Sequence, residues 1–142
     1  MEREIERYFE QDRFAKHLGI TLVESSPGYA KMSMPIREFH LNGVGISHGG
    51  AIFSLADCAF AVASNSHGTV ALAINVAISY FKAKRQGTLF AEAREVARNS
   101  KLATYEVTVT DESGELIALF QGTVYRKKER LSEVITEGGA ER

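Results

Sequence analysis

Apolar and polar side chains alternate along several stretches in the second half of the chain, which is typical of β-strands. In the stretch 70–82 the bulky side chains from Leu72 to Tyr80 fall on one face, and small ones, including Ala73 and Asn75, fall on the other. Three further strand-like stretches follow, separated by turn sequences at 86–87, 99–100 and 111–114. Connections this short join antiparallel neighbours, so the pattern predicts an antiparallel sheet.

A continuous apolar run precedes these strands. From Gly49 to Ala63 the side chains are small or apolar on every side of a helix, apart from Ser54 and Asp57. A helix of this kind needs cover on most of its sides. The economical arrangement is an α+β fold in which an antiparallel β-sheet wraps around this one central helix.

The remaining segments are shorter or more charged. Residues 1–16 carry a loose stripe of apolar side chains at helical spacing, which predicts one surface helix. The turn sequence 25–28 lies between two β-rich runs and predicts a hairpin, while residues 37–47 predict a loop. The charged residues 127–142 are expected to form a flexible tail. Residues 1–142 are about the length of a single domain.

The composition and net charge of the chain exclude several classes of function. With 17 basic and 18 acidic side chains the net charge is −1, so no general field attracts nucleic acid or an anionic membrane. The longest apolar run falls short of the roughly 20 residues that cross a bilayer. One cysteine makes no internal disulfide, and the first residues show no secretory signal, so we expect a cytoplasmic protein. The four histidines show no paired metal-ligand spacing, and we expect no metal site.

Asp57 is the one charged residue within the apolar run. Burying an unpaired carboxylate is costly, so Asp57 must be hydrogen-bonded, protonated, or directed into a cavity or interface. One interpretation is a structural acid that bonds Ser54 or a strand group, with Ser47 as the cap of the helix. The other is functional, because the loop sequence GISHGG leads straight into the helix start. Unpaired N–H groups there favour an oxygen that develops negative charge.

The spacing of these two features constrains the functional interpretation. Gly49 and Asp57 are eight residues apart. A rise of about 1.5 Å per residue separates them by roughly 12 Å along a helix, so they do not touch one reacting carbonyl in the same chain. If they act together, Asp57 faces the helix start of a second copy. The hypothesis therefore predicts an obligate oligomer with two sites across a two-fold interface.

The sequence NGVGISHGGAIFSLADCAFA (42–61) and the strands over 78–128 resemble the hotdog-fold acyl-CoA thioesterases of the phenylacetate-degradation type, the PaaI-like family. The resemblance covers about residues 12–128 in order. It implies a hotdog fold and hydrolysis of an acyl-CoA to a free acid and coenzyme A, with a phenylacetyl-type group as a candidate acyl group. Because the family often pairs dimers, it also implies a homo-oligomer that is at least a dimer and, by that pairing, a homotetramer.

The same resemblance assigns catalytic roles. It makes Asp57 a general base or a nucleophile, and it leaves these two alternatives open. The backbone amides of Gly49 and Gly50 polarise the thioester carbonyl. Asn42 assists at the reacting centre, and His48 either positions the helix start or supports the leaving sulfur.

One departure from the family concerns the strand that opens ALAINVAISYF. Related enzymes often carry a Ser or Thr there that holds the water, whereas this chain has Ala73. Either Asn75, two residues on and on the same small face, substitutes for it, or the water is held differently. The pocket walls are expected to include Phe53, Phe60 and Tyr80. The coenzyme A phosphates need basic groups, for which the candidates are Lys84, Arg85, Arg98 and Lys101, with Lys82 and Arg126 as further options. No cofactor is expected, since coenzyme A is part of the substrate.

The sequence also bears on three classes of function other than hydrolysis by Asp57. An apolar helix raises the pKa of the Cys58 thiol, which makes a thiol nucleophile an unfavourable interpretation. The arrangement of His and acid that hydratases of this fold use is not found. A non-catalytic module that binds acyl-CoA or another small ligand is the remaining alternative. Replacing Asp57 distinguishes the two, because the replacement changes turnover in an enzyme but only affinity in a binding module.

Overall fold

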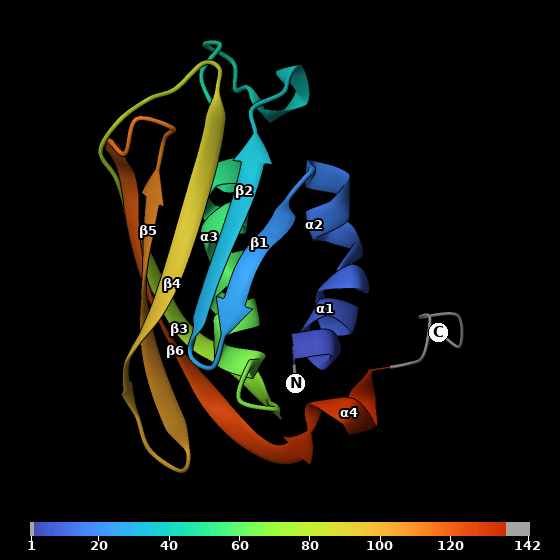
Figure 1. The fold of residues 1–142 in the computed structure, drawn as a ribbon. Helices are drawn as coiled ribbons and strands as arrows, with labels where there is room; N and C mark the ends of the chain where they lie inside the picture. Colours follow the sequence, from blue (N-terminus) through green and yellow to red (C-terminus); the bar gives the residue numbers. More distant parts are fainter. Residues whose placement is uncertain (1, 136–142) are drawn as a thin grey trace.

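The computed structural model describes residues 2–135. Its elements are, in chain order, α1 (Glu2–Glu10), α2 (Arg13–Leu18), β1 (Thr21–Ser26), β2 (Tyr29–Pro35), the single-turn helix η1 (Glu38–His40), α3 (Gly49–Asn65), β3 (Thr69–Tyr80), β4 (Thr88–Arg98), β5 (Leu102–Thr110), β6 (Leu116–Arg130) and α4 (Leu131–Val134). Figure 1 shows three layers: the sheet, then α3 against one face of it, then α1 and α2 on the far side of α3.

The six strands form one antiparallel sheet in the order β1-β2-β4-β5-β6-β3. The predicted hairpin joins β1 to β2, and the three predicted turns join β3 to β4, β4 to β5 and β5 to β6. The sheet curves around α3, which contacts all six strands (Figure 1). The predicted α+β architecture, an antiparallel sheet wrapped around one central helix, is confirmed. Strands β1 and β3 are its two edges.

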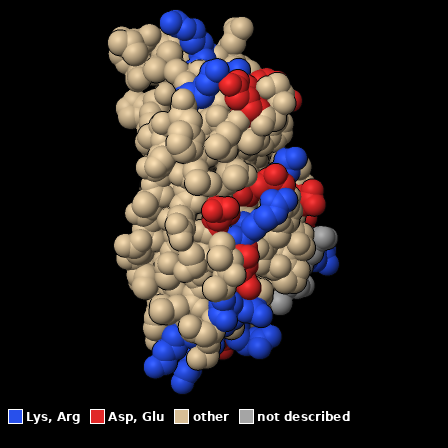
Figure 2. Space-filling model, turned by 90° about the vertical axis from the view of Figure 1, so that its left-hand side faces the viewer, with Lys and Arg blue, Asp and Glu red and all other residues tan. Residues whose placement is uncertain are grey.

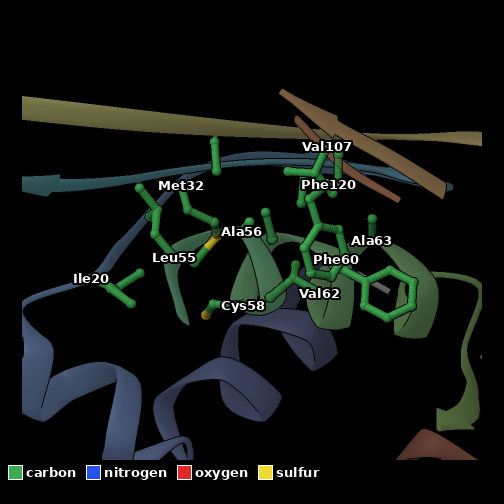
Figure 3. Packing of buried hydrophobic residues seen from close by; sticks show 14 of the residues in the cluster. Ile20, Met32, Leu55, Ala56, Cys58, Phe60, Val62, Ala63, Val107 and Phe120 are labelled. Atoms are coloured by element: carbon green, nitrogen blue, oxygen red, sulfur yellow. The ribbon is translucent and has the colours of Figure 1, made fainter. Parts of the chain in front are cut away.

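Helix α3 is apolar all round because it is covered on two sides. Phe60 and Phe120 point toward one another between α3 and the sheet, with their ring centroids 5.4 Å apart (Figure 3). Cys58 and Val62 lie on the opposite side of α3, toward the N-terminal helices. Fully burying a side chain such as Phe60 contributes roughly 1.5 to 3 kcal/mol.

Gly122 of β6 allows the sheet to approach α3 closely. A Cβ at this position would lie 2.7 Å from Cζ of Phe60, closer than real contacts allow. Phe60 is 1% exposed and packs against the sheet, so it belongs to the core and is not the pocket wall that the sequence suggested.

The N-terminal segment forms two helices where one was predicted over residues 1–16, and residue 1 lies outside the described residues. The break occurs at Asp12, whose Oδ1 accepts the N–H of Ala15 at 3.0 Å and so caps α2. Gly19 ends α2 with a φ of 79°, a left-handed conformation that glycine adopts readily. Ile5 and Phe9 are buried, so α1 packs on the body of the molecule with its apolar stripe.

Strand β3 contains a bulge that changes which side chains share a face. Ala73 pairs with Val124, and Asn75 pairs with Thr123, so Ile74 is an extra residue. Directly paired residues point to the same face of a sheet. Val124 is buried on the α3 side, so Ala73 and Asn75 lie on opposite faces, and the predicted shared face of these two residues is wrong.

The charged C-terminal segment is more ordered than the predicted tail over 127–142. Residues 127–130 complete β6, and Leu131, which is buried, begins α4. Residues 136–142 lie outside the described residues, so the prediction is wrong for 127–134. The predicted loop 37–47 contains the short helix η1.

Candidate active site at the start of the central helix

The start of α3 is capped by a histidine. Nδ1 of His48 accepts the N–H of Gly50 at 2.8 Å, so the predicted cap at Ser47 is wrong. The ring nitrogen takes the place that a hydroxyl oxygen was expected to fill. The Ser47 hydroxyl is instead buried without a hydrogen-bond partner in the described part of the chain.

This cap makes the backbone N–H groups of Gly49 and Gly50 different, although both were predicted to polarise the thioester carbonyl. The Gly50 N–H is already bonded to His48, whereas the Gly49 N–H has no partner within residues 2–135. Gly49 is the first residue of a 17-residue helix, where the helix dipole adds partial positive charge. The Gly49 N–H is therefore the donor that is free to bind an oxygen with developing negative charge.

A pocket of about 360 Å³ lies beside this amide. It is lined by Asn42, Ile46, Ser47, Gly49, Ile52, Tyr80, Phe81, Lys82 and Ala83. The hydroxyl of Tyr80 donates to the Gly49 carbonyl oxygen at 2.9 Å, which ties the end of β3 to the start of α3. The pocket combines apolar walls with a few polar groups, as small-molecule sites commonly do.

Asn42 shapes the loop that leads into the helix. Its Oδ1 accepts the N–H of Val44 at 3.0 Å and the N–H of Ile46 at 3.2 Å. The side chain thus replaces backbone partners in an irregular turn. The structure places Asn42 in the same pocket as Gly49, as its predicted role requires.

Asp57 is half-buried in the middle of α3 and has no hydrogen-bond partner among the described residues. The structural interpretation of this residue fails, because the Ser54 hydroxyl donates to the Gly50 carbonyl oxygen at 2.7 Å instead. Burial and the nearby carboxylate of Asp12 raise the pKa of Asp57 above its usual range. An unpaired carboxylate with a raised pKa is suited to proton transfer.

Gly49 and Asp57 are not brought together within one chain. Helix α3 runs without interruption from Gly49 to Asn65, so the rise of the helix separates the two by about 12 Å. Asp57 lies instead in a small cavity of about 70 Å³ between α3 and α2.

The alternative nucleophile, Cys58, is buried, and its burial raises the pKa of the thiol well above its usual range. A thiol that stays protonated is a poor nucleophile. Within residues 2–135, no three His, Cys, Asp or Glu side chains gather as metal ligands, and no helix is both long and apolar enough to cross a membrane.

Comparison with known proteins decides the family. Residues 44–118 match the family model described as the thioesterase superfamily. The acyl-coenzyme A thioesterase PaaI of Escherichia coli K12 is 35% identical over 119 residues, covering 83% of this chain and 85% of that protein. The chain belongs to the PaaI-like branch of the thioesterase superfamily. As a member of this superfamily it is a thioester hydrolase, with the hotdog fold.

One further relative of this PaaI-like thioesterase, and a solved structure of the E. coli protein, extend the comparison. A protein of Archaeoglobus fulgidus, provisionally named an esterase, is 48% identical over 130 residues, which cover 91% of this chain and 84% of that protein. The solved structure of the E. coli PaaI protein from the phenylacetic acid degradation operon superposes with a TM-score of 0.87 at 32% identity. That superposition covers 90% of this chain and 94% of that chain.

Two of the predicted phosphate-binding residues of the thioesterase already have partners. Nζ of Lys84 lies 3.2 Å from Oδ2 of the buried Asp111. A guanidinium nitrogen of Arg98 lies 2.6 Å from Nδ1 of His67, and its Nε lies 3.8 Å from Glu95. Both cations therefore have structural roles within the chain.

The other two predicted basic residues have no ion-pair partner in the described part of the thioesterase. A terminal nitrogen of Arg85 lies 3.6 Å from where a Cβ on Gly45 would be, so Arg85 lies beside the loop before α3. Lys101 lies in the turn between β4 and β5. Figure 2 shows Lys and Arg side chains gathered near both ends of the sheet side of the molecule, with a mixed band between them.

The remaining predicted residues of the thioesterase are spread over the fold. Phe53 is half-buried, and its ring lies 5.6 Å from that of Phe120. Asn75 lies on the outer face of the sheet, so this chain does not bring it to the helix start. The hydroxyl bond of Tyr80 and the position of Asp12 beside Asp57 were not predicted. Asp12 carries the one usable signal, because Asp followed by a helical run is a cap pattern.

Proposed function

We propose that the chain hydrolyses acyl-CoA thioesters, with aromatic acyl groups of the phenylacetyl type as preferred substrates. The observation that carries the proposal is a pair of unsatisfied groups on one helix. Gly49 has a free N–H beside a pocket, and Asp57 has a carboxylate without a partner in the described chain. An oxyanion donor and a carboxylate base are the groups that thioester hydrolysis needs.

The proposed site combines Gly49 of one protomer with the partner subunit's Asp57. The thioester carbonyl oxygen accepts the Gly49 N–H. The partner subunit's Asp57 takes a proton from water, and the hydroxide attacks the carbonyl carbon. The oxyanion that forms is held by the amide, a contribution of roughly 3 to 4 kcal/mol where such a donor has been removed from other enzymes.

Collapse of this intermediate breaks the carbon–sulfur bond. The electron pair leaves with the sulfur, and the proton held by Asp57 passes to the coenzyme A thiolate, so the products are a free acid and coenzyme A. In the nucleophilic alternative the carboxylate of Asp57 attacks the carbonyl carbon directly, and the carbon–sulfur bond breaks to release the coenzyme A thiolate. Water then hydrolyses the mixed anhydride to the free acid and the Asp57 carboxylate, and the proton that this releases passes to the thiolate. Neither route needs a cofactor or a metal.

The proposed dimer is supported by the exposed edge of the sheet. Strand β3 is 12 residues long and lies at the edge, with Leu72 53% and Ile74 59% exposed. Long apolar edge strands favour pairing with another chain. We propose pairing of β3 with β3 of a second copy, and pairing of two such dimers into a tetramer. A cytoplasmic location is part of the same proposal.

The choice of an aromatic acyl group has two supports. The E. coli relative is described as a protein of the phenylacetic acid degradation operon. The pocket beside Gly49 has an aromatic side chain in Phe81 and an aliphatic one in Ile52, which suit a flat apolar group. For the coenzyme A phosphates the candidates are Arg85, which lies beside the loop before α3, and Lys101, since neither has an ion-pair partner within residues 2–135.

The first experiment measures release of coenzyme A thiol from a panel of aromatic and straight-chain acyl-CoAs. Wild type is compared with Asp57→Asn at matched folding and oligomeric state. We expect turnover with aromatic substrates to be highest in wild type and to fall by about a hundredfold or more in the variant. Binding without thiol release by wild type supports the non-catalytic module instead, and equal activity in both proteins contradicts the mechanism.

A second experiment tests the shared site. Gly49→Pro removes the amide hydrogen at the first helical position, where proline is favoured. His48 has φ −65° and ψ 135°, a conformation that suits a residue before proline. Gly49→Pro and Asp57→Asn are each expected to be inactive. An equal mixture, dissociated and reassociated, should regain about a quarter of wild-type activity, because each mixed dimer has one intact site. No recovery in confirmed mixed dimers contradicts the shared site.

A further inference from the structure

Tyr80 holds a peptide group next to the proposed oxyanion donor. Its hydroxyl donates to the Gly49 carbonyl oxygen at 2.9 Å, and the N–H of the same peptide group donates to Nδ1 of His48 at 2.8 Å. The peptide between Gly49 and Gly50 is thus fixed at both its oxygen and its nitrogen. The next carbonyl, that of Gly50, accepts the Ser54 hydroxyl at 2.7 Å.

This arrangement matters because two consecutive glycines begin the helix. Glycine has more backbone freedom than any other residue, and the first helical N–H groups have no partners within the helix. The direction of the Gly49 N–H depends on how the adjoining peptide is held. A donor lowers the barrier to oxyanion formation to the extent that its direction is set before the reaction.

The backbone of Tyr80 is held in the sheet. It ends β3 and pairs with Ala118 of β6, and the following N–H of Phe81 donates to the Ile117 carbonyl oxygen at 2.8 Å. Its ring lies over Gly49, since a Cβ there would be 3.4 Å from both Cζ and the hydroxyl oxygen. Burial raises the pKa of Tyr80, so the phenol stays protonated and donates throughout the neutral range.

We propose that Tyr80 is a positioning residue whose hydroxyl holds the Gly49–Gly50 peptide so that the Gly49 N–H is directed at the thioester carbonyl oxygen. The inference rests on the proposed function, because it concerns the same site. Tyr80 acts through Gly49 and does not touch the reacting atoms. Its loss weakens an interaction of the transition state more than it weakens binding of the substrate.

Tyr80→Phe tests this inference, because it removes the hydroxyl and keeps the ring. We expect kcat to fall about tenfold while KM stays within about twofold of wild type. The matched control is Tyr125→Phe, the same change on β6 at a similar exposure, 45% against 47%. Tyr125 pairs with Leu72 and Leu102, away from the pocket, and its variant should keep wild-type kcat and KM.

A second measurement does not depend on activity. Amide hydrogen exchange at Gly50 should be at least about threefold faster in Tyr80→Phe than in wild type, and unchanged in Tyr125→Phe, because the peptide loses one of its two holds. Unchanged exchange at Gly50 overturns the inference whether or not the protein is active.

The outcomes also separate this inference from the proposed function. Active wild type with unchanged kcat in Tyr80→Phe overturns the positioning role alone. A raised KM with unchanged kcat makes Tyr80 a substrate contact, which also overturns it. Wild type that releases no thiol from any acyl-CoA contradicts the proposed function, and Gly50 exchange then decides whether Tyr80 fixes the helix start.

Discussion

Asp12 and Asp57 line the same small cavity between the N-terminal helices and α3. Asp12 accepts the N–H of Ala15 as the cap of α2, so its side chain is held in place, whereas Asp57 has no hydrogen-bond partner in the described chain. Burial, and then the negative charge of Asp12, raise the pKa of Asp57 from 3.8. The N-terminal helices thereby tune the carboxylate on which the proposed chemistry depends.

Replacing Asp12 by Asn is therefore expected to shift the pH dependence of the enzyme. Asp57 acts when ionised, so kcat/KM falls as the pH drops through its pKa. Asn keeps the cap of α2 but removes the charge, and the pKa of Asp57 falls. The acidic limb of the kcat/KM profile should move to lower pH by a fraction of a unit to about one unit.

Asp12→Ala is the companion variant, since it removes both the charge and the cap. It should shift the acidic limb in the same direction and also lower stability by about 1 kcal/mol, measured by urea denaturation. A shift of the limb to higher pH in Asp12→Asn contradicts the assignment of Asp57 as the titrating group. Tyr8 and Cys58 do not interfere, because burial raises the pKa of each well above the range of the assay.

Two variants of Asn42 should separate its loop role from its role at the reacting centre. Asn42→Asp keeps an oxygen that accepts from Val44 and Ile46, so stability should stay near that of wild type. It loses the side-chain amide donor and adds a negative charge that opposes an oxyanion, so kcat/KM should fall at least about tenfold. Asn42→Ala should lose activity and also about 1 to 2 kcal/mol of stability.

Thermal unfolding and thiol release in parallel decide between these roles of Asn42. Wild-type activity in Asn42→Asp means that the residue acts through the loop alone. Asn42→Ala with unchanged stability means that the two loop hydrogen bonds contribute nothing measurable.

Gly122→Ala should destabilise the fold by about 1 to 3 kcal/mol, because the new methyl group overlaps the buried ring of Phe60. The control is Gly43→Ala, since a Cβ at Gly43 has no neighbour within 4 Å. Denaturant midpoints measure both. In the double variant with Phe60→Leu the loss should be smaller than the sum of the single losses. An additive result places the strain elsewhere.

The pair of Asp111 and Lys84 should make stability depend on pH below neutrality. The Ser113 hydroxyl, backbone N–H groups and Lys84 hold the pKa of Asp111 well below its usual range. A lowered pKa contributes stability above the unfolded value, near about 4, and this contribution is lost as the pH falls. Asp111→Asn should thus be less stable than wild type at pH 7, and the difference should shrink toward pH 2. A constant difference contradicts this account.

Much of the fold can be predicted from the periodicity of apolar side chains, because the faces that each element buries must be apolar. Tyr105, Val107 and Val109 alternate with polar residues in the sequence and are fully buried in β5. The run from Gly49 to Ala63 is apolar on all sides because the sheet covers one side of α3 and the N-terminal helices cover another. The sequence therefore predicts which elements exist and how they are layered.

The bulge in β3 shows where periodicity fails. One extra residue, Ile74, reverses the faces of all later residues relative to earlier ones, yet it leaves composition and hydrophobic content unchanged. Asn75 therefore does not take the place of a hydroxyl at Ala73. The register of β3 is visible only from its pairing with β6, and this pairing exists only in the folded sheet.

The candidate site likewise contains features that local sequence predicts and features that depend on the folded structure. Gly49 and Asp57 were found from chemistry and spacing along one helix, which are local properties. The hydroxyl bond from Tyr80 depends on where β3 ends relative to the start of α3, and the proximity of Asp12 to Asp57 depends on the packing of α2. Both are contacts between distant segments, which a single sequence does not encode in any local pattern.

The uninterrupted course of α3 has a consequence for how this chain tolerates change in length. The helix fixes Gly49 and Asp57 at a set separation and a set angle about one axis. Deleting a single residue between them turns the carboxylate by about 100° around the helix and moves it by about 1.5 Å. Substitutions between the two residues are tolerated wherever packing allows, whereas insertions and deletions there displace Asp57 relative to Gly49. The length of the segment between Gly49 and Asp57 is therefore fixed, whereas the turns of the sheet tolerate the gain or loss of residues.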